Sequence, residues 1–195
     1  MSDVSQIVLH VLGMLAMGWR GGPGTYNGVV LYTVLALPVV LLFVLIRPSA
    51  FASVGLVYGT VPWIWMTMIP GGGAGVVPGR VSLIPFKDLL EMGAFQAVAN
   101  LFVLSALGFF GPIRFVALRS VKRVVIVAAC CSAAIEIAQY VLMLDRVSSI
   151  DDFFLNTAGA GLAAMLSRRW WLTEPALQVG VGDRAVEEPE RAAVQ

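Results

Sequence analysis

Long runs of apolar residues, separated by short polar connections, occupy most of this chain of 195 residues. A helix needs about 20 mainly apolar residues to cross the roughly 30 Å hydrocarbon core of a bilayer. Five runs meet or approach that length: residues 28–46, 51–69, 94–111, 124–144 and 153–171. Backbone N–H and C=O groups cannot stay unpaired in hydrocarbon, and no alternating pattern indicates a barrel. Each run is therefore predicted to be a membrane-spanning helix.

A shorter apolar run at residues 7–19 is predicted to be a sixth helix that stays in the membrane. A cleaved signal peptide would carry Lys or Arg before the run and a small-x-small cleavage site after it. Instead, Asp3 is the charged residue before the run, and the run ends at Trp19-Arg20 without such a site. An interfacial helix is the alternative for this segment.

Composition supports the membrane class. Hydrophobic residues make up 58% of the chain and charged residues 13%, against about 45–50% and about 25% in soluble domains. With 13 Lys+Arg and 12 Asp+Glu, no basic excess points to nucleic acid. Cys130 and Cys131 are adjacent in an apolar run with no histidine nearby, so neither a bridge between them nor a zinc site is expected. No metal, cofactor or nucleic-acid partner is predicted.

The connections between the runs predict an orientation, because Lys and Arg mark the cytoplasmic side of short loops. Seven basic residues fall on one side of a six-span protein: Arg47, Arg114, Arg119, Lys122, Arg123, Arg168 and Arg169. The other side carries four, together with several aspartates. The predicted fold is thus an all-α, polytopic transmembrane helix bundle of about six spans, with both termini cytoplasmic. Its predicted location is the cell membrane, as a multi-pass protein.

Three segments are expected along the chain. Residues 1–80 would hold about three membrane helices and an outer Gly-rich loop that begins as a flexible linker. Residues 81–171 would form a three-span membrane domain, opened by a short turn or helix at the interface. Residues 172–195, which contain two prolines and a run of glutamates, are predicted to be a disordered cytoplasmic tail.

A few polar residues inside the predicted spans are the candidates for function. A charge near the bilayer centre costs at least about 2.5–3.5 kcal/mol on insertion scales, so such residues mark functional sites by default. Glu136 lies well inside the fifth span, and Ser132 and Gln139 share its helix face. Topology brings further polar groups to the same outward-facing half. The predicted binding set is Asn100, Ser132, Glu136, Gln139, Arg146, Asp151, Asp152 and Asn156.

A purely structural role is the alternative for these groups. Glu136 could be protonated or paired with Arg146, and the amides could join helices to one another. Asp151 or Asp152 could serve as the N-cap of the sixth span. The small residues that follow, among them Gly159 and Gly161, would let another helix approach closely.

The motifs of the second half resemble the VanZ-like family of membrane proteins. They are Ser82-Leu83-Ile84-Pro85-Phe86, Asn100-Leu101-Phe102, Ser132…Glu136…Gln139 and Arg146…Asp151-Asp152…Asn156…Gly159. The resemblance covers roughly residues 82–171. Two positions depart from it: Ser105 stands where the family commonly has proline, and Ser149 where it tends to carry an acid.

The resemblance implies a role in the cell envelope, because the family is named for a member of a glycopeptide-resistance cluster associated with reduced teicoplanin susceptibility. The function expected here is non-enzymatic: antibiotic tolerance, or binding of a membrane lipid or lipid-linked cell-wall precursor in the outward-facing polar pocket. Arg146 would then pair with a phosphate group. An intramembrane enzyme with Glu136 as general base and Asp151 and Asp152 holding a divalent ion is the alternative, followed by an ion-coupled transporter.

Overall fold

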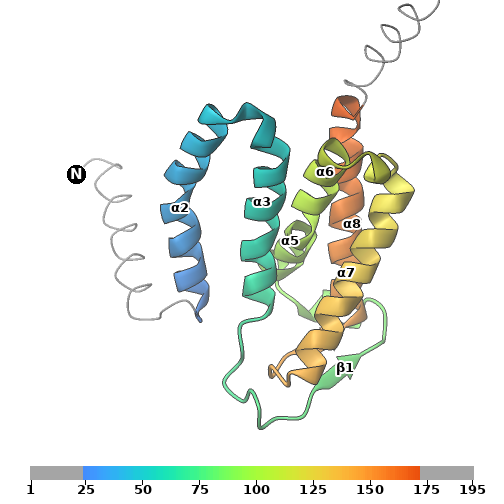
Figure 1. Cartoon of the computed structure of the whole chain (residues 1–195). Helices are drawn as coiled ribbons and strands as arrows, with labels where there is room; N and C mark the ends of the chain where they lie inside the picture. The colour runs from blue at the N-terminus through green and yellow to red at the C-terminus, as the bar shows by residue number, and fades with distance from the viewer. Residues whose placement is uncertain (1–23, 172–195) are drawn as a thin grey trace, which may run out of the picture.

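The computed structural model describes residues 24–171, and this part of the chain is mostly helical (Figure 1). The main helices are α2 (Tyr26–Ile46), α3 (Phe51–Thr67), α5 (Ala94–Val103), α6 (Ser105–Arg114), α7 (Val121–Val141) and α8 (Ile150–Ser167). Shorter elements connect them: η1 (Pro48–Ala50), β1 (Arg80–Ser82), α4 (Lys87–Glu91), η2 (Val116–Leu118), β2 (Val147–Ser149) and η3 (Arg168–Trp170). The predicted helix at residues 7–19 and the predicted tail at 172–195 lie outside the described residues.

Within residues 24–171, three helical segments are long and apolar enough to cross a membrane: Tyr26–Ile46, Ala94–Arg114 and Val121–Val141. The second of them is α5 and α6 together, which are interrupted at Leu104 rather than forming the single helix that was predicted. The chain is therefore a helical protein of the membrane type, and the figure of about six spans stays a prediction.

Helix α8 lies at the centre of a tight group that includes α5, α6 and α7. The buried core of this group includes Val103, Leu104, Val124, Ile135 and Trp171, and Leu107 and Ile113 of α6 pack against it. Helix α3 packs on the outside against α6, and α2 contacts mainly α3 (Figure 1). The described chain thus consists of a packed bundle with a helical hairpin, α2–α3, along one side.

Glycines explain how closely α8 approaches its neighbours. A Cβ on Gly159 would lie 2.7 Å from the carbonyl carbon of Leu101 in α5, and one on Gly108 of α6 would lie 2.7 Å from that of Ala160. Only residues without a side chain permit such backbone contact, which is how membrane helices gain dispersion energy. The predicted small-residue surface of this helix is confirmed.

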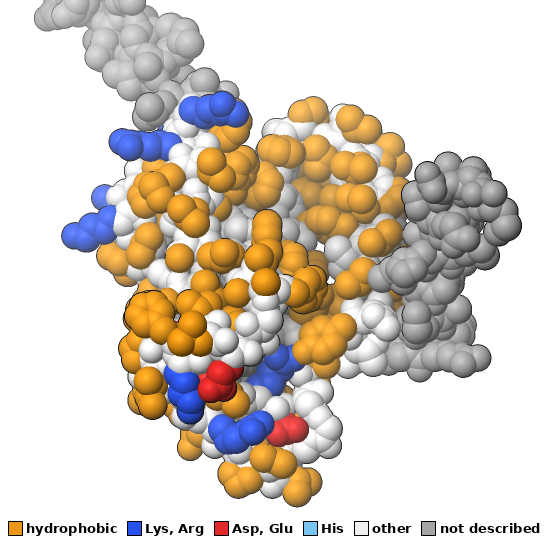
Figure 2. Space-filling model, turned by 180° about the vertical axis from the view of Figure 1, so that it is seen from behind, with side chains coloured by type: hydrophobic (Ala, Val, Ile, Leu, Met, Phe, Trp, Pro, Cys, Tyr) orange, Lys and Arg blue, Asp and Glu red, His pale blue; other side chains and the backbone are white. Residues whose placement is uncertain are grey.

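Charged side chains gather at the two ends of the bundle. One end, here called the basic end, carries Arg47, Arg114, Arg119, Lys122, Arg123, Arg168 and Arg169. The other, the acidic end, carries every Asp and Glu of residues 24–171: Asp88, Glu91, Glu136, Asp145, Asp151 and Asp152. Figure 2 shows basic side chains at the top, acidic and basic ones near the bottom, and apolar surface between. This separation fits the predicted orientation, which itself stays a prediction.

The Gly-rich segment that opens the long loop is wrongly predicted as a free linker. The N–H of Gly71 donates to the carbonyl oxygen of Leu144 at 2.8 Å, and that of Gly73 to the Asp145 carboxylate at 2.9 Å. A little further on, β1 pairs in parallel with β2, with Arg80 opposite Val147. Three-residue strands carry no pattern that sequence reading can detect, so this small sheet was not expected. It ties the loop before α4 to the turn before α8.

Candidate binding site

The acidic end is organised around the start of α8. Ser149 is the N-cap of this helix, and its hydroxyl oxygen accepts from the N–H of Asp151 at 3.1 Å. The prediction that Asp151 or Asp152 is the N-cap is therefore wrong, because both lie within the first turn. A hydroxyl at the N-cap satisfies a free N–H and leaves the two carboxylates available for other partners.

Asp151 caps a different helix. Its side chain is 3% exposed, and its two carboxylate oxygens accept from the backbone N–H groups of Phe86 at 2.7 Å and Leu89 at 3.0 Å. Phe86 has a left-handed backbone (φ 66°) at the start of α4. The buried Asp151 thus holds this strained turn against α8, which is a structural task.

Asp152 and Asn156 face two other helices from one side of α8. Asp152 accepts from the amide of Asn100 in α5 at 2.5 Å. One turn further along, the Asn156 amide donates to the hydroxyl of Ser132 in α7 at 3.0 Å, and both residues are buried. The side-chain amide oxygen of Asn156, Oδ1, has no hydrogen-bond partner among the described residues. The predicted polar face of this span therefore does join three helices.

Glu136 lies one turn beyond Ser132 on α7, and one of its carboxylate oxygens accepts from the backbone N–H of Ser149 at 2.9 Å. Within residues 24–171 this is the one hydrogen bond to its carboxylate. Glu136 also lines a cavity of about 370 Å³ between β1, α7 and the start of α8. The other lining residues are mostly apolar: Val81, Leu83, Ala133, Ile137, Tyr140, Ser148, Ser149, Ile150 and Phe153. The surface that these residues, Glu136 included, present to the cavity is apolar.

Asp88 adds a further carboxylate to this end. It accepts from the Ser149 hydroxyl at 2.6 Å, so Ser149 links Asp88, Glu136 and the first turn of α8. The hydroxyl groups of Ser149 and Ser82 hold the pKa of Asp88 below its ordinary value, since they stabilise the ionised form. Asp88 also lies close enough to Asp152 to act on it electrostatically. The Ser149 hydroxyl thus supports the surrounding acids.

Gln139 and Arg146 serve a second group of contacts, at the end of α3. The Gln139 amide donates to the carbonyl oxygen of Thr67 at 2.9 Å. The guanidinium of Arg146 donates to the carbonyl oxygen of Ile69 at 3.1 Å and to the hydroxyl of Tyr26 at the start of α2. These carbonyls are the unpaired acceptors of a helix C-terminus, where a cation is also favoured by the helix dipole.

The predicted set thus divides into two groups. One group surrounds the start of α8 and consists of Asn100, Asp152, Ser132, Asn156, Glu136 and Asp151. The other group, Gln139 and Arg146, contacts the end of α3. The considered pairing of Glu136 with Arg146 is not observed: within residues 24–171 the one ion pair joins Arg80 and Asp145, at 3.3 Å. The Arg146 guanidinium therefore donates hydrogen bonds to carbonyl oxygens at the end of α3 and not to a carboxylate.

The acids at this end are arranged as hydrogen-bond acceptors. Among the described residues, no group of three or more His, Cys, Asp or Glu side chains is arranged to hold a metal ion. What the arrangement offers instead is hydrogen-bond acceptance: carboxylates held in place by N–H, hydroxyl and amide donors. A ligand that carries amine, amide or hydroxyl donors suits such a site.

Three residues of this region were missed as site residues. Ser149 stands three positions before Asp152, and this Ser-x-x-Asp pattern ahead of an apolar run is a helix-start signal that would have identified the N-cap. Asp88 and Tyr26 had no such signal. They lie 61 and 120 residues from their partners Ser149 and Arg146, so only the fold brings them together.

The family model described as VanZ/LLP1 matches residues 29–172 of the chain. This range begins far ahead of Ser82, where the motif resemblance began, and so includes the α2–α3 hairpin. No curated protein and no solved structure matches the chain.

Proposed function

The chain belongs to the VanZ/LLP1 family, and on that premise we propose that it is a multi-pass cell-membrane protein that acts in the cell envelope without catalysis. In this proposal the acidic end faces outward, in line with the positive-inside rule. The site there binds the headgroup of a membrane lipid or of a lipid-linked cell-wall precursor. Antibiotic tolerance would follow from this binding.

The observation that carries the proposal is the position of Glu136. Glu136 is one of the residues that line an apolar cavity of about 370 Å³, a volume within the roughly 300–1,000 Å³ typical of small-ligand sites. An ionisable group inside a membrane helix costs insertion free energy and is retained mainly where it does something. The Ser149 N–H fixes one carboxylate oxygen, so the orientation of the other is set in advance.

The surroundings of the cavity favour an amphiphilic ligand. Leu83 and Ile137 line it and are 70% and 61% exposed, so apolar surface continues from the cavity onto the outside of the bundle. A water-soluble molecule would gain nothing from that surface. A lipid can lay its chain along it while a headgroup amine, amide or hydroxyl donates to Glu136.

Arg146 has a supporting part in this proposal. Its donors already serve the end of α3 and the start of α2. It therefore acts as a positioning residue that holds the α2–α3 hairpin against the turn leading to β2 and α8, and the proposal does not require it to contact phosphate.

Replacement of Glu136 by glutamine tests this function in cells. The glutamine amide keeps an oxygen for the Ser149 N–H but loses the charge that strengthens the bond to a cationic or polar donor. Cells that produce the wild-type chain are expected to tolerate more teicoplanin than cells without it, and the Glu136→Gln variant is expected to give no protection. The measurement is the minimal inhibitory concentration at matched protein levels.

The matched control is Glu91→Gln, which removes an exposed acid from α4 at the same end of the bundle. It is expected to protect as well as the wild type. Full protection by Glu136→Gln at normal abundance would remove the carboxylate from the function, and absence of protection by the wild type would refute the tolerance role.

A further inference from the structure

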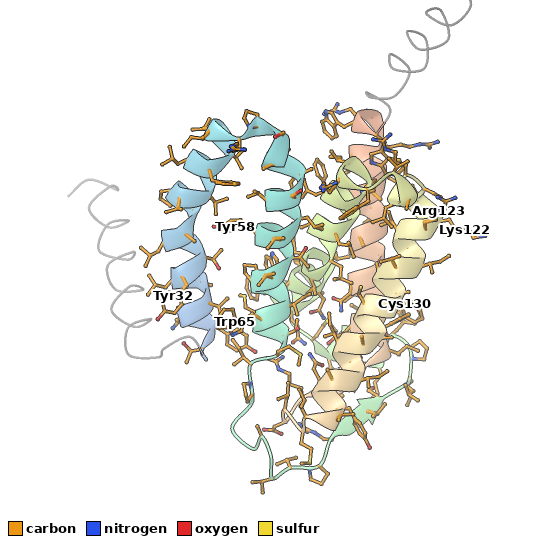
Figure 3. The ribbon with its side chains drawn as sticks, viewed as in Figure 1. Tyr32, Tyr58, Trp65, Lys122, Arg123 and Cys130 are labelled. Carbon is orange, nitrogen blue, oxygen red and sulfur yellow. The ribbon has the colours of Figure 1, made fainter. Side chains whose placement is uncertain are left out.

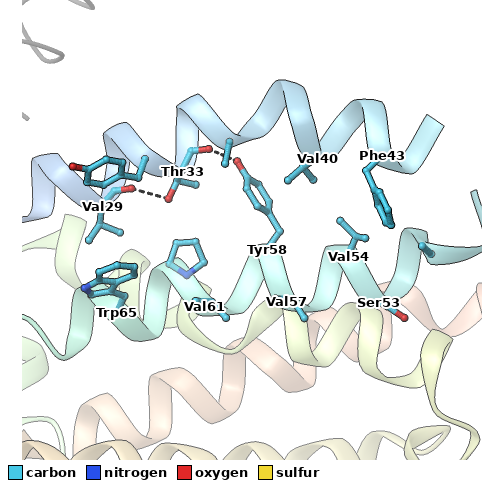
Figure 4. Close-up of a pocket in the computed structure, with 14 residues that line it drawn as sticks. Val29, Thr33, Val40, Phe43, Ser53, Val54, Val57, Tyr58, Val61 and Trp65 are labelled. Atoms are coloured by element: carbon cyan, nitrogen blue, oxygen red, sulfur yellow. Dashed lines mark hydrogen bonds between the residues drawn. The ribbon is translucent and has the colours of Figure 1, made fainter. Parts of the chain in front are cut away.

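A second hollow lies away from the acidic end, between α2 and α3. It has a volume of about 680 Å³ and runs along the hairpin (Figure 4). Apolar side chains dominate its lining, among them Phe43, Val57 and Val61, and Ser53 and Tyr58 contribute hydroxyl groups. We call it the hairpin groove.

The two helices stand apart because little joins them. Across the described residues the one side-chain hydrogen bond between α2 and α3 runs from the Tyr58 hydroxyl to the carbonyl oxygen of Thr33, at 2.5 Å. Figure 4 shows Tyr58 reaching across the groove, with Val40, Phe43 and Val54 on one side of it and Val29 and Trp65 on the other. The part beside Phe43 and Ser53 leads to the basic end.

Empty apolar space of this size costs dispersion energy on every surface that lines it. Within residues 24–171, the spanning window of α2 is 6% buried, so this helix gains little from packing against the rest of the bundle. Because α2 is long and apolar enough to span a bilayer, lipid is the medium expected beside the groove. An acyl chain is the apolar body that this medium supplies.

The positive charge at the basic end favours lipids with an anionic headgroup. Arg114 donates from Nε to the hydroxyl of Ser53, which lines the groove, at 2.8 Å. Arg47 follows directly after α2 at the turn that closes this end of the hairpin, and both arginines are exposed. Among the described residues the basic end contains no Asp or Glu that could neutralise them. An anion is therefore complementary to this mouth of the groove.

We propose that the hairpin groove binds an anionic phospholipid, with an acyl chain between α2 and α3 and the phosphate at Arg47 and Arg114. Guanidinium groups suit this task because they bond phosphate through paired donors. The hairpin groove is separate from the Glu136 cavity. It lies between other helices, it leads to the opposite end of the bundle, and its mouth is complementary to an anion. It does not depend on the envelope function proposed above.

A photoreactive amino acid at Val57 tests the occupant. Val57 lines the groove and is 60% exposed, so a larger side chain can be accommodated there, and Val61 at 50% is a second position should the first variant fold poorly. The full-length chain is placed in nanodiscs of phosphatidylcholine with a minor share of phosphatidylglycerol, irradiated, and analysed by mass spectrometry. Phosphatidylglycerol adducts are expected to exceed the share of this lipid in the bilayer by about fivefold for each arginine.

The charge requirement is tested in the same assay. The double variant Arg47→Gln/Arg114→Gln is expected to form adducts in proportion to bilayer composition. Lys122→Gln is the control, since Lys122 is a basic-end residue on α7, across the molecule from Tyr58 (Figure 3), and it should leave the enrichment unchanged. Adducts to residues 7–19 of the same chain, adducts to a second copy, or lipid adducts without phosphatidylglycerol enrichment would each overturn the proposal.

Discussion

Replacing Gly159 by alanine is expected to destabilise the bundle by about 1–3 kcal/mol or more, the range for inserting a methyl group into a packed core. The new Cβ would collide with the backbone oxygen of Leu101 and would lie 2.7 Å from its carbonyl carbon. Backbone cannot give way as a side chain can, so α5 would have to move away from α8. Thermal unfolding in detergent and the yield of monodisperse protein are the measurements.

Gly161→Ala is the matched control on the same helix. Its Cβ would meet the end of a side chain, Val125 Cγ2, at 3.1 Å, which a small side-chain adjustment relieves. The expected loss of stability is well below that of Gly159→Ala. Equal behaviour of the two variants would mean that α5 and α8 do not touch through their backbones.

Arg146→Gln is expected to have the second large effect, a loss of at least about 1.5–3 kcal/mol, the range for a hydrogen bond made by a charged group. The variant removes the guanidinium that donates to the carbonyl oxygen of Ile69 and to the hydroxyl of Tyr26. Because Ile69 is 6% exposed, water does not easily replace that donor. The measurement is the free energy of unfolding of the purified protein.

Arg80→Gln serves as its control. Arg80 is also a basic residue at the acidic end, but its side chain is 58% exposed and its contact is an ion pair with Asp145. Exposed pairs of this kind contribute about 0–1 kcal/mol. A loss in Arg146→Gln no greater than in Arg80→Gln would show that Arg146 does not hold the end of α3.

The positions of the helices could be predicted because the membrane leaves few choices for an apolar run. Residues 28–46 and 51–69 correspond closely to α2 and α3. The predicted span at 124–144 begins later than the helix it corresponds to. Helix α7 starts at Val121 and includes Lys122 and Arg123. Charged side chains at a helix end can extend toward water, so a charge does not mark where the helix starts.

The candidate site was predictable only in part. The helix period placed Ser132 and Glu136 on one face of α7, and the structure brings Ser132 to Asn156 and Asn100 to Asp152. The separate role of Arg146 could not be foreseen, because it depends on where the end of α3 lies in space. The same holds for the pairing of β1 with β2, which connects strands of three residues that are far apart in the chain.

Identification of the lipid that copurifies with the protein decides whether Glu136 holds a lipid headgroup. The full-length wild type, Glu136→Gln and Glu91→Gln are purified from the same membranes in a mild detergent, and bound lipids are identified by mass spectrometry. One envelope lipid or lipid-linked precursor with headgroup donors is expected to be enriched on the wild type and on Glu91→Gln. This lipid is expected to be lost from folded Glu136→Gln. The same lipids in the same amounts on all three proteins would contradict this role of Glu136.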